Sequence, residues 1–227
     1  MVPKCLMRRV LQHLMRCLLW SLLWCAGTAM ALSDRQQAAL DQAVVAHGEG
    51  RVDAARRAFE ALARQGVPAA AYNLGVMHIE GQLPAASASQ AQRWFERAAA
   101  GGFVSAQFAL GQLFETGRLG RPDLVRAHRW YEQAAAAGSV DAQVAAGTAY
   151  YLGRGAPKSP ADAARWFREA AKGGDVGAQY LLASMYEQGD GLARDLRLAR
   201  YWYDIAARNG DVAAPGKVKE LDLRAAN

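Results

Sequence analysis

The sequence has 227 residues, of which 52% are hydrophobic and 21% charged, and this composition excludes a wholly disordered chain. The net charge is +6, but residues 1–31 contain four basic residues and no acidic ones. The remaining 23 basic and 21 acidic residues give only +2, and no Lys/Arg block with interleaved aromatics indicates nucleic-acid binding.

Residues 1–31 have the pattern of a secretory signal peptide. A basic start is followed by the apolar run "CLLWSLLWCA" and by the small-residue cleavage pattern Ala29-Met30-Ala31. The run is shorter than the roughly 18 residues of a membrane-spanning helix. We therefore expect an exported protein without a membrane span after cleavage, most simply periplasmic, with secreted or envelope-associated protein as alternatives.

Other interpretations of this segment stay open. They are an uncut N-terminal anchor, a twin-arginine signal at Arg8-Arg9, a lipid anchor at Cys25, and translation starts at Met7 or Met15. All three cysteines, Cys5, Cys17 and Cys25, lie in this segment, so cleavage leaves a chain without disulfides, thiolate metal sites or a cysteine nucleophile.

Residues 32–66 are predicted to form an N-terminal helical pair. Within "DAARRAFEALARQG", Ala55, Phe59 and Gly66 are in register with Ala91, Phe95 and Gly102 further along the chain, so the pair is interpreted as a degenerate half repeat.

Residues 67–211 repeat with a period of 36, which predicts four copies at 67–102, 103–138, 139–174 and 175–211. The columns that define the period are Trp94, Trp130, Trp166, Trp202; Gly81, Gly117, Gly153, Gly189; Gly102, Gly138, Gly174, Gly210; and Ala70, Ala106, Ala142, Ala178.

Each copy is predicted to contain two helices. In the first, Ala70 and Leu74 share one face, Gly75 permits close packing, and Gly81 ends the helix. In the second, of about residues 87–100, Ala91, Phe95 and Ala98 form the buried stripe, with Trp94 packing at its edge against the adjoining helix.

The second helix has clear start signals in the third copy, where Ser159 is the predicted N-cap, Pro160 the first helical residue and Asp162 the third-residue partner. Asp123 and Asp195 are the equivalent caps in the second and fourth copies. After Asp211 the pattern is expected to break at Pro215, and residues 212–227 are predicted to form a C-terminal capping helix.

These residues resemble the Sel-one-like repeat family, which is related to tetratricopeptide repeats. The fourth copy, "AQYLLASMYEQGDGLARDLRLARYWYDIAARNG", follows the family pattern nearly throughout, whereas the loops of the first two copies lack its G-x-G. The resemblance implies an all-α fold, an α/α superhelical solenoid of helix-turn-helix repeats. It also implies a non-catalytic scaffold or adaptor of the bacterial envelope that binds another protein.

The residues themselves show no catalytic or metal-binding motif. Ser-x-x-Lys, G-x-S-x-G and H-E-x-x-H are absent, and His47, His78 and His128 stand in different copies at no ligand spacing. We expect no catalytic residues, no metal and no cofactor. The alternative functions are a cell-wall-associated enzyme or β-lactam/peptidoglycan-binding protein, and a glycan-binding module.

A second face of the first helices is the candidate partner surface, because its aromatics and low charge suit neither a buried nor a merely solvated face. We expect it to bind an extended peptide or a helix in the concave groove, the alternative being that it only packs neighbouring first helices together. It comprises Tyr72, Val76, Ile79; Phe108, Gln112, Glu115; Val144, Thr148, Tyr151; and Tyr180, Ser184, Glu187.

Overall fold

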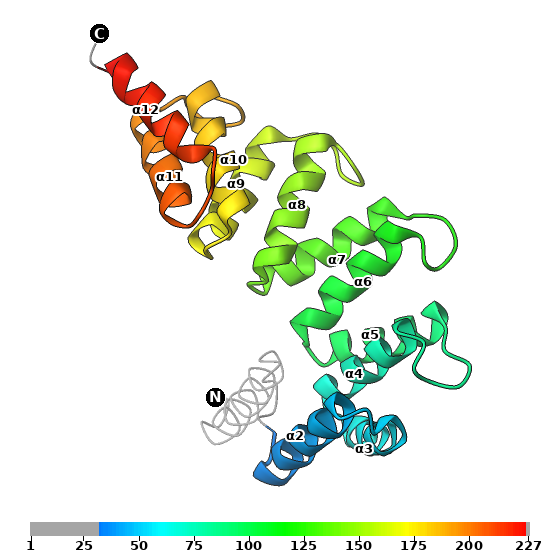
Figure 1. The fold of residues 1–227 in the computed structure, drawn as a ribbon. Coiled ribbons are helices and arrows are strands. Elements are labelled where there is room, and N and C mark those ends of the chain that lie inside the picture. The colour runs from blue at the N-terminus through cyan, green and yellow to red at the C-terminus, as the bar shows by residue number, and fades with distance from the viewer. Residues whose placement is uncertain (1–31, 226–227) are drawn as a thin grey trace, which may run out of the picture. The chain divides into compact units, whose positions relative to one another are not determined.

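The computed structural model describes residues 32–225, so the predicted signal peptide lies outside the described residues. Every described helix belongs to one compact unit, residues 34–227. Between residues 32 and 225 all regular structure is α-helical. The predicted all-α solenoid is confirmed (Figure 1).

The helices follow one another as pairs. They are α2 (Asp34–Gly48), α3 (Val52–Arg64), α4 (Pro68–Ile79), α5 (Ala88–Ala100), α6 (Val104–Thr116), α7 (Leu124–Ala136), α8 (Val140–Leu152), α9 (Pro160–Lys172), α10 (Val176–Gln188), α11 (Leu196–Arg208) and α12 (Ala214–Ala225). The principal contacts join each helix to the next along the chain. We call α4, α6, α8 and α10 the first helices, and α5, α7, α9 and α11 the second helices.

The helix ends follow the local signals. Ser159 Oγ accepts a hydrogen bond from the Asp162 amide and donates one to Asp162 Oδ2, with Pro160 at the first helical position. Asp123 and Asp195 accept amide hydrogen bonds at the starts of α7 and α11. The predicted caps are confirmed, and they satisfy amides that a helix start otherwise leaves without partners.

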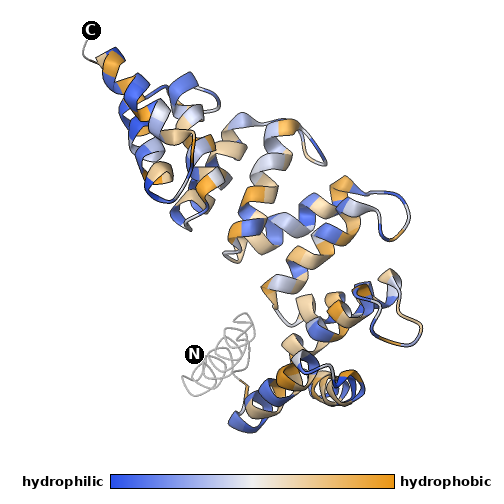
Figure 2. Ribbon diagram, viewed as in Figure 1, coloured by the Kyte–Doolittle hydropathy of each residue, from blue (hydrophilic) through white to orange (hydrophobic). Residues whose placement is uncertain are grey.

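The core lies between successive helices, both within a repeat and from one repeat to the next. Hydrophobic and hydrophilic residues are interspersed along the helices (Figure 2). Ala91, Phe95 and Ala98 are buried, as predicted. Trp130 and Trp166 pack, partly buried, against the cluster that contains Tyr131, and Trp202 packs against two such clusters. For these three residues the expected inter-helix packing is confirmed.

Glycines in the first helices make room for the second helices. A Cβ on Gly75 would stand 2.4 Å from the ring of Phe95, and a Cβ on Gly111 would stand 2.4 Å from Tyr131. The close approach predicted at Gly75 is therefore that of an aromatic ring of the same repeat.

At three junctions a side-chain hydrogen bond to the carboxyl end of a preceding helix links the repeats. Gln143 Nε2 donates to the Ala135 carbonyl at 3.3 Å, and Gln179 Nε2 donates to the Ala171 carbonyl at 3.1 Å. At the first junction the equivalent of these glutamines is Ala71, and there the Arg97 guanidinium donates to the Ala63 carbonyl instead.

The C-terminal helix continues the repeat register. The sequence pattern predicts a break at Pro215, whereas α12 begins at Ala214 and has Pro215 in its first turn. In the first turn of a helix the missing amide proton of proline removes no helix hydrogen bond. Ala214 extends the column of Ala70 and its equivalents and is fully buried. Helix α12 thus stands where the first helix of a further repeat would stand.

Candidate functional site

The twelve predicted groove residues lie on the first helices α4, α6, α8 and α10. Gln112, Glu115 and Thr148 are exposed, and the other nine are partly buried. Nine of the twelve line cavities between successive first helices; the exceptions are Val144, Tyr180 and Glu187.

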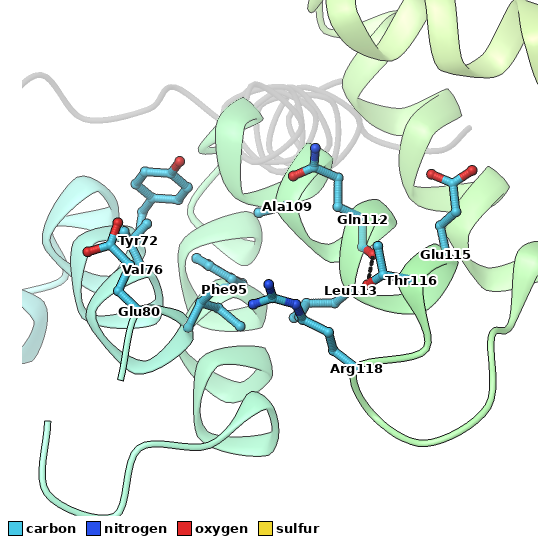
Figure 3. A pocket seen from close by; sticks show the side chains of 11 residues that line it. Tyr72, Val76, Glu80, Phe95, Ala109, Gln112, Leu113, Glu115, Thr116 and Arg118 are labelled. Atoms are coloured by element: carbon cyan, nitrogen blue, oxygen red, sulfur yellow. Dashed lines mark hydrogen bonds between the residues drawn. The ribbon is translucent and has the colours of Figure 1, made fainter. Parts of the chain in front are cut away.

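The cavity between α4 and α6 has a volume of about 380 Å³. Figure 3 shows Tyr72, Val76 and Glu80 on the α4 side, Gln112 on the α6 side and Phe95 between them. The Arg118 side chain reaches toward the cavity from the end of α6. The floor is therefore apolar, and charged groups lie at the edges. Beside it, Tyr72, Phe108 and Gln112 also line a further cavity of about 580 Å³.

The cavity between α6 and α8 is polar. It has a volume of about 210 Å³, and its lining includes Glu115, Tyr131, His128, Thr148 and Arg154. The Tyr131 hydroxyl donates a hydrogen bond to Glu115 Oε2 at 2.6 Å. Burial and this hydrogen bond raise the pKa of Tyr131, so the hydroxyl remains a donor at neutral pH.

His128 is a second buried titratable group of this cavity, with 6% of its surface exposed. Its Nε2 lies 3.5 Å from Glu132 Oε2, and its ring contacts Tyr150 edge-on at a centroid distance of 4.7 Å. Burial lowers the pKa of His128, although Glu132 opposes the shift, so the imidazole is neutral at pH 7.

The cavity between α8 and α10 is again apolar. It has a volume of about 200 Å³ and is lined by Tyr151, Leu152, Phe167, Leu181 and Met185, among others. Leu152 and Leu181 are exposed at its edge, with 53% and 40% of their surfaces accessible. Exposed apolar side chains that lie together are typical of interaction surfaces.

The equivalent space between α10 and α12 is occupied by side chains of α12. Glu187 Oε2 accepts a hydrogen bond from the Tyr203 hydroxyl at 3.0 Å and lies 3.4 Å from Lys217 Nζ. The Arg224 guanidinium lies 3.1 Å from Glu187 Oε1. Burial opposes the shift, but the Tyr203 hydroxyl, Lys217 and Arg224 lower the pKa of Glu187.

In each repeat, the last groove position of the first helix and the buried aromatic of the second helix change together. Where the buried aromatic of the second helix is Phe, at 95 and 167, the groove position is Ile79 or Tyr151. Where it is Tyr, at 131 and 203, the groove position is Glu and the hydroxyl binds the carboxylate. The row therefore alternates between apolar and acidic positions.

The groove aromatics also contact the core. Tyr72 lies 5.5 Å from Phe95, Phe108 lies 5.5 Å from Tyr131, and Tyr180 lies 5.0 Å from Tyr203, measured between ring centroids. These rings pack on the second helix of their own repeat, and the Tyr72 ring also lies 5.1 Å from that of Phe103 at the start of α6. The groove aromatics therefore take part in packing both within a repeat and toward the next first helix.

Sequence reasoning missed the contributions of Arg118, His128, Tyr131 and Arg154 to the cavities. One signal in the sequence could have identified the Tyr131 contribution. The column of Phe95 changes to Tyr in the same repeats in which the column of Ile79 changes to Glu. Among residues 32–225 no group of three or more His, Cys, Asp or Glu side chains could hold a metal ion. No helix in that range is long and apolar enough to cross a membrane.

The sequence of this chain matches a known repeat family. The family model described as Sel1 repeat matches residues 68–103, 104–139, 140–175 and 176–211. A search of curated proteins finds no match.

Solved structures that are similar to this chain include the following two. A protective antigen of uropathogenic Escherichia coli strains, which displays an SLR fold, shares 33% identity at a TM-score of 0.67. The match covers 75% of this chain and 36% of the antigen, so this chain corresponds to about a third of the antigen's length. A Sel1 repeat protein from Oxalobacter formigenes shares 28% identity at a TM-score of 0.73, covering 79% of this chain and 74% of that one.

Proposed function

We propose, from the premise that this chain belongs to the Sel1 repeat family, that it is a non-catalytic adaptor that binds another protein along the row of cavities between its first helices. Proteins built from Sel1 repeats are generally protein-interaction scaffolds. The partner contributes an extended peptide or a helix, and the sequence of residues 1–31 supports a location in the bacterial envelope, most simply the periplasm.

The observation that supports this proposal is the equivalence of the three cavities. Each lies between two successive first helices, at the same place in the repeat, and volumes of about 200–380 Å³ suit single side chains. A row of side-chain pockets is the arrangement by which a groove recognises a peptide or helix. No comparable observation favours the cell-wall enzyme or the glycan-binding module.

The experiment compares two matched substitutions. Gln112→Arg places a long charged side chain in the cavity between α4 and α6, whereas Gln133→Arg makes the same change on the exposed surface of α7, away from these cavities. We expect Gln112→Arg to reduce capture of a partner from envelope extract about tenfold, while Gln133→Arg behaves like the unchanged protein.

Both proteins are assayed by cross-linking and mass spectrometry, with circular dichroism as the folding control. Equal capture by the two variants would contradict binding in the groove. The Tyr72, Phe108 and Tyr180 positions are less suitable for this test, because their rings contact the core and alanine there also removes packing.

A further inference from the structure

The junction between α10 and α12 shows how this repeat binds a basic side chain. Tyr203 fixes one oxygen of Glu187, and Lys217 and Arg224, two turns apart on α12, approach the same carboxylate. Only 10% of the Glu187 side chain is exposed. Since a buried carboxylate requires compensation of its charge, the two cations account for its position.

The junction between α6 and α8 has an equivalent carboxylate, that of Glu115, but no lysine or arginine on α8 that corresponds to Lys217 or Arg224. Glu115 and Tyr131 stand 72 residues before Glu187 and Tyr203 and form the same hydrogen bond. Helix α8, however, has Ala145 and Leu152 at the positions of Lys217 and Arg224. Ala145 lines the 210 Å³ cavity, so the volume that Lys217 occupies at the last junction is open here.

The Glu115 carboxylate has unused acceptor capacity. Its one hydrogen bond among the described residues comes from Tyr131, and within residues 32–225 it forms no ion pair. A carboxylate has about four lone-pair sites. The Tyr131 hydroxyl holds the group in place, which reduces the entropy that a bound cation would have to overcome.

From this internal precedent we infer that the cavity between α6 and α8 binds a lysine or arginine side chain of the protein that occupies the groove, with Glu115 as its counter-ion. The inference rests on the proposed function and specifies the partner's chemistry. Because the flanking cavities are floored by Phe95 and Phe167, the partner segment presents a basic residue between two apolar ones.

Arg154 also lines this cavity and is the group that could favour an anion instead. It is exposed, and its side chain forms no ion pair among the described residues. If a cation binds, Arg154→Gln removes a repulsive charge and strengthens binding. If an anion binds, the same change weakens it.

The first test rebuilds the last junction within the full chain. The variant Ala145→Lys/Leu152→Arg gives α8 the two cations of α12. We expect its Tm to rise by about 2–4 °C, which is the order expected for one good ion-pair network in a domain of this size. The same change in a Glu115→Gln background should give no rise. An equal rise in both backgrounds, or none in either, would overturn the inference.

The second test uses a random library of phage-displayed peptides as the probe. The library is selected on the unchanged protein, and the binders are measured on Glu115→Gln, Arg154→Gln and Gln112→Arg. We expect Lys or Arg enrichment between apolar residues, about tenfold weaker binding by Glu115→Gln and tighter binding by Arg154→Gln. Gln112→Arg should weaken the same peptides.

The outcomes separate the two proposals. Peptides that lose binding to Gln112→Arg, yet lack basic residues and bind Glu115→Gln unchanged, would overturn the cation site while supporting the groove. A failure to select peptides sensitive to Gln112→Arg would contradict both. Weaker binding by Arg154→Gln would identify the site as one for an anion and overturn the inference.

Discussion

Gly75 packs against the Cδ1–Cε1 side of the Phe95 ring. A Cβ built on this glycine would stand 2.4 Å from Cε1 and 2.5 Å from Cδ1 of the ring, closer than carbon atoms approach in folded proteins. The glycine lowers helix propensity by about 1 kcal/mol relative to alanine, and the close helix pairing it permits offsets that loss.

Substitution of Gly75 by alanine is expected to destabilise the protein. Overpacking costs about 1–3 kcal/mol, which exceeds the gain in helix propensity. Gly177→Ala is the control, because its Cβ would meet only Asp175 Oδ1, at 3.4 Å. Urea denaturation should show a lower free energy of unfolding for Gly75→Ala and an equal or higher one for Gly177→Ala. A Gly75→Ala protein as stable as the unchanged one would refute the packing argument.

Gln179 is expected to contribute more stability than its equivalent Gln143. Gln179 donates to the Ala171 carbonyl and accepts from Asn209 Nδ2 at 3.0 Å. Gln143 donates to the Ala135 carbonyl at 3.3 Å, and its buried Oε1 has no hydrogen-bond partner among residues 32–225. Since a net hydrogen bond is worth about 1 kcal/mol, Gln179→Met should lower the unfolding free energy by about 1 kcal/mol more than Gln143→Met.

Chemical denaturation of the two near-isosteric variants measures this difference. Equal losses would show that the second hydrogen bond of Gln179 contributes nothing to the link between repeats.

Glu187→Gln is expected to loosen α12. The substitution weakens ion pairs with Lys217 and Arg224, which are 32% and 48% exposed, so solvent screening limits the loss to about 1–2 kcal/mol. Hydrogen exchange should accelerate in α12 before it does in α10. Glu220→Gln is the control, because Glu220 pairs with the same two cations from within α12. Similar exchange in both variants would exclude the link between helices.

His128 makes the stability depend on pH. Its pKa is lowered below the ordinary value of 6.5, so the unfolded chain binds a proton that the folded imidazole does not. This contribution is fully present above pH 6.5, and the free energy of unfolding falls as the pH decreases below that value. The difference between the unchanged protein and His128→Gln should therefore shrink or reverse at pH 5. In a His47→Gln control the free energy of unfolding should still decline below pH 6.5. If the difference between the unchanged protein and His128→Gln did not vary with pH, the assignment of this decline to His128 would be contradicted.

The amino-acid sequence alone predicted the repeat period, the helix pairs and most of the helix ends. These features depend on residues three, four or thirty-six positions apart, such as Ser159 with Asp162 or Ala70 with Ala106, and such relations can be read along the chain. It also identified Phe95 as core, because the helical period groups apolar residues on one face whatever they pack against.

Which side chains meet between helices could be seen only in the folded chain. Arg97 donates to the Ala63 carbonyl, whereas two later junctions use Gln143 and Gln179, and α12 continues the register past Pro215. Above all, the acceptor that Lys217 and Arg224 complete at Glu187 is left open at Glu115. The physical reason is that each of these contacts depends on the direction and reach of side chains on different helices, and periodicity fixes a residue's face without fixing its partner.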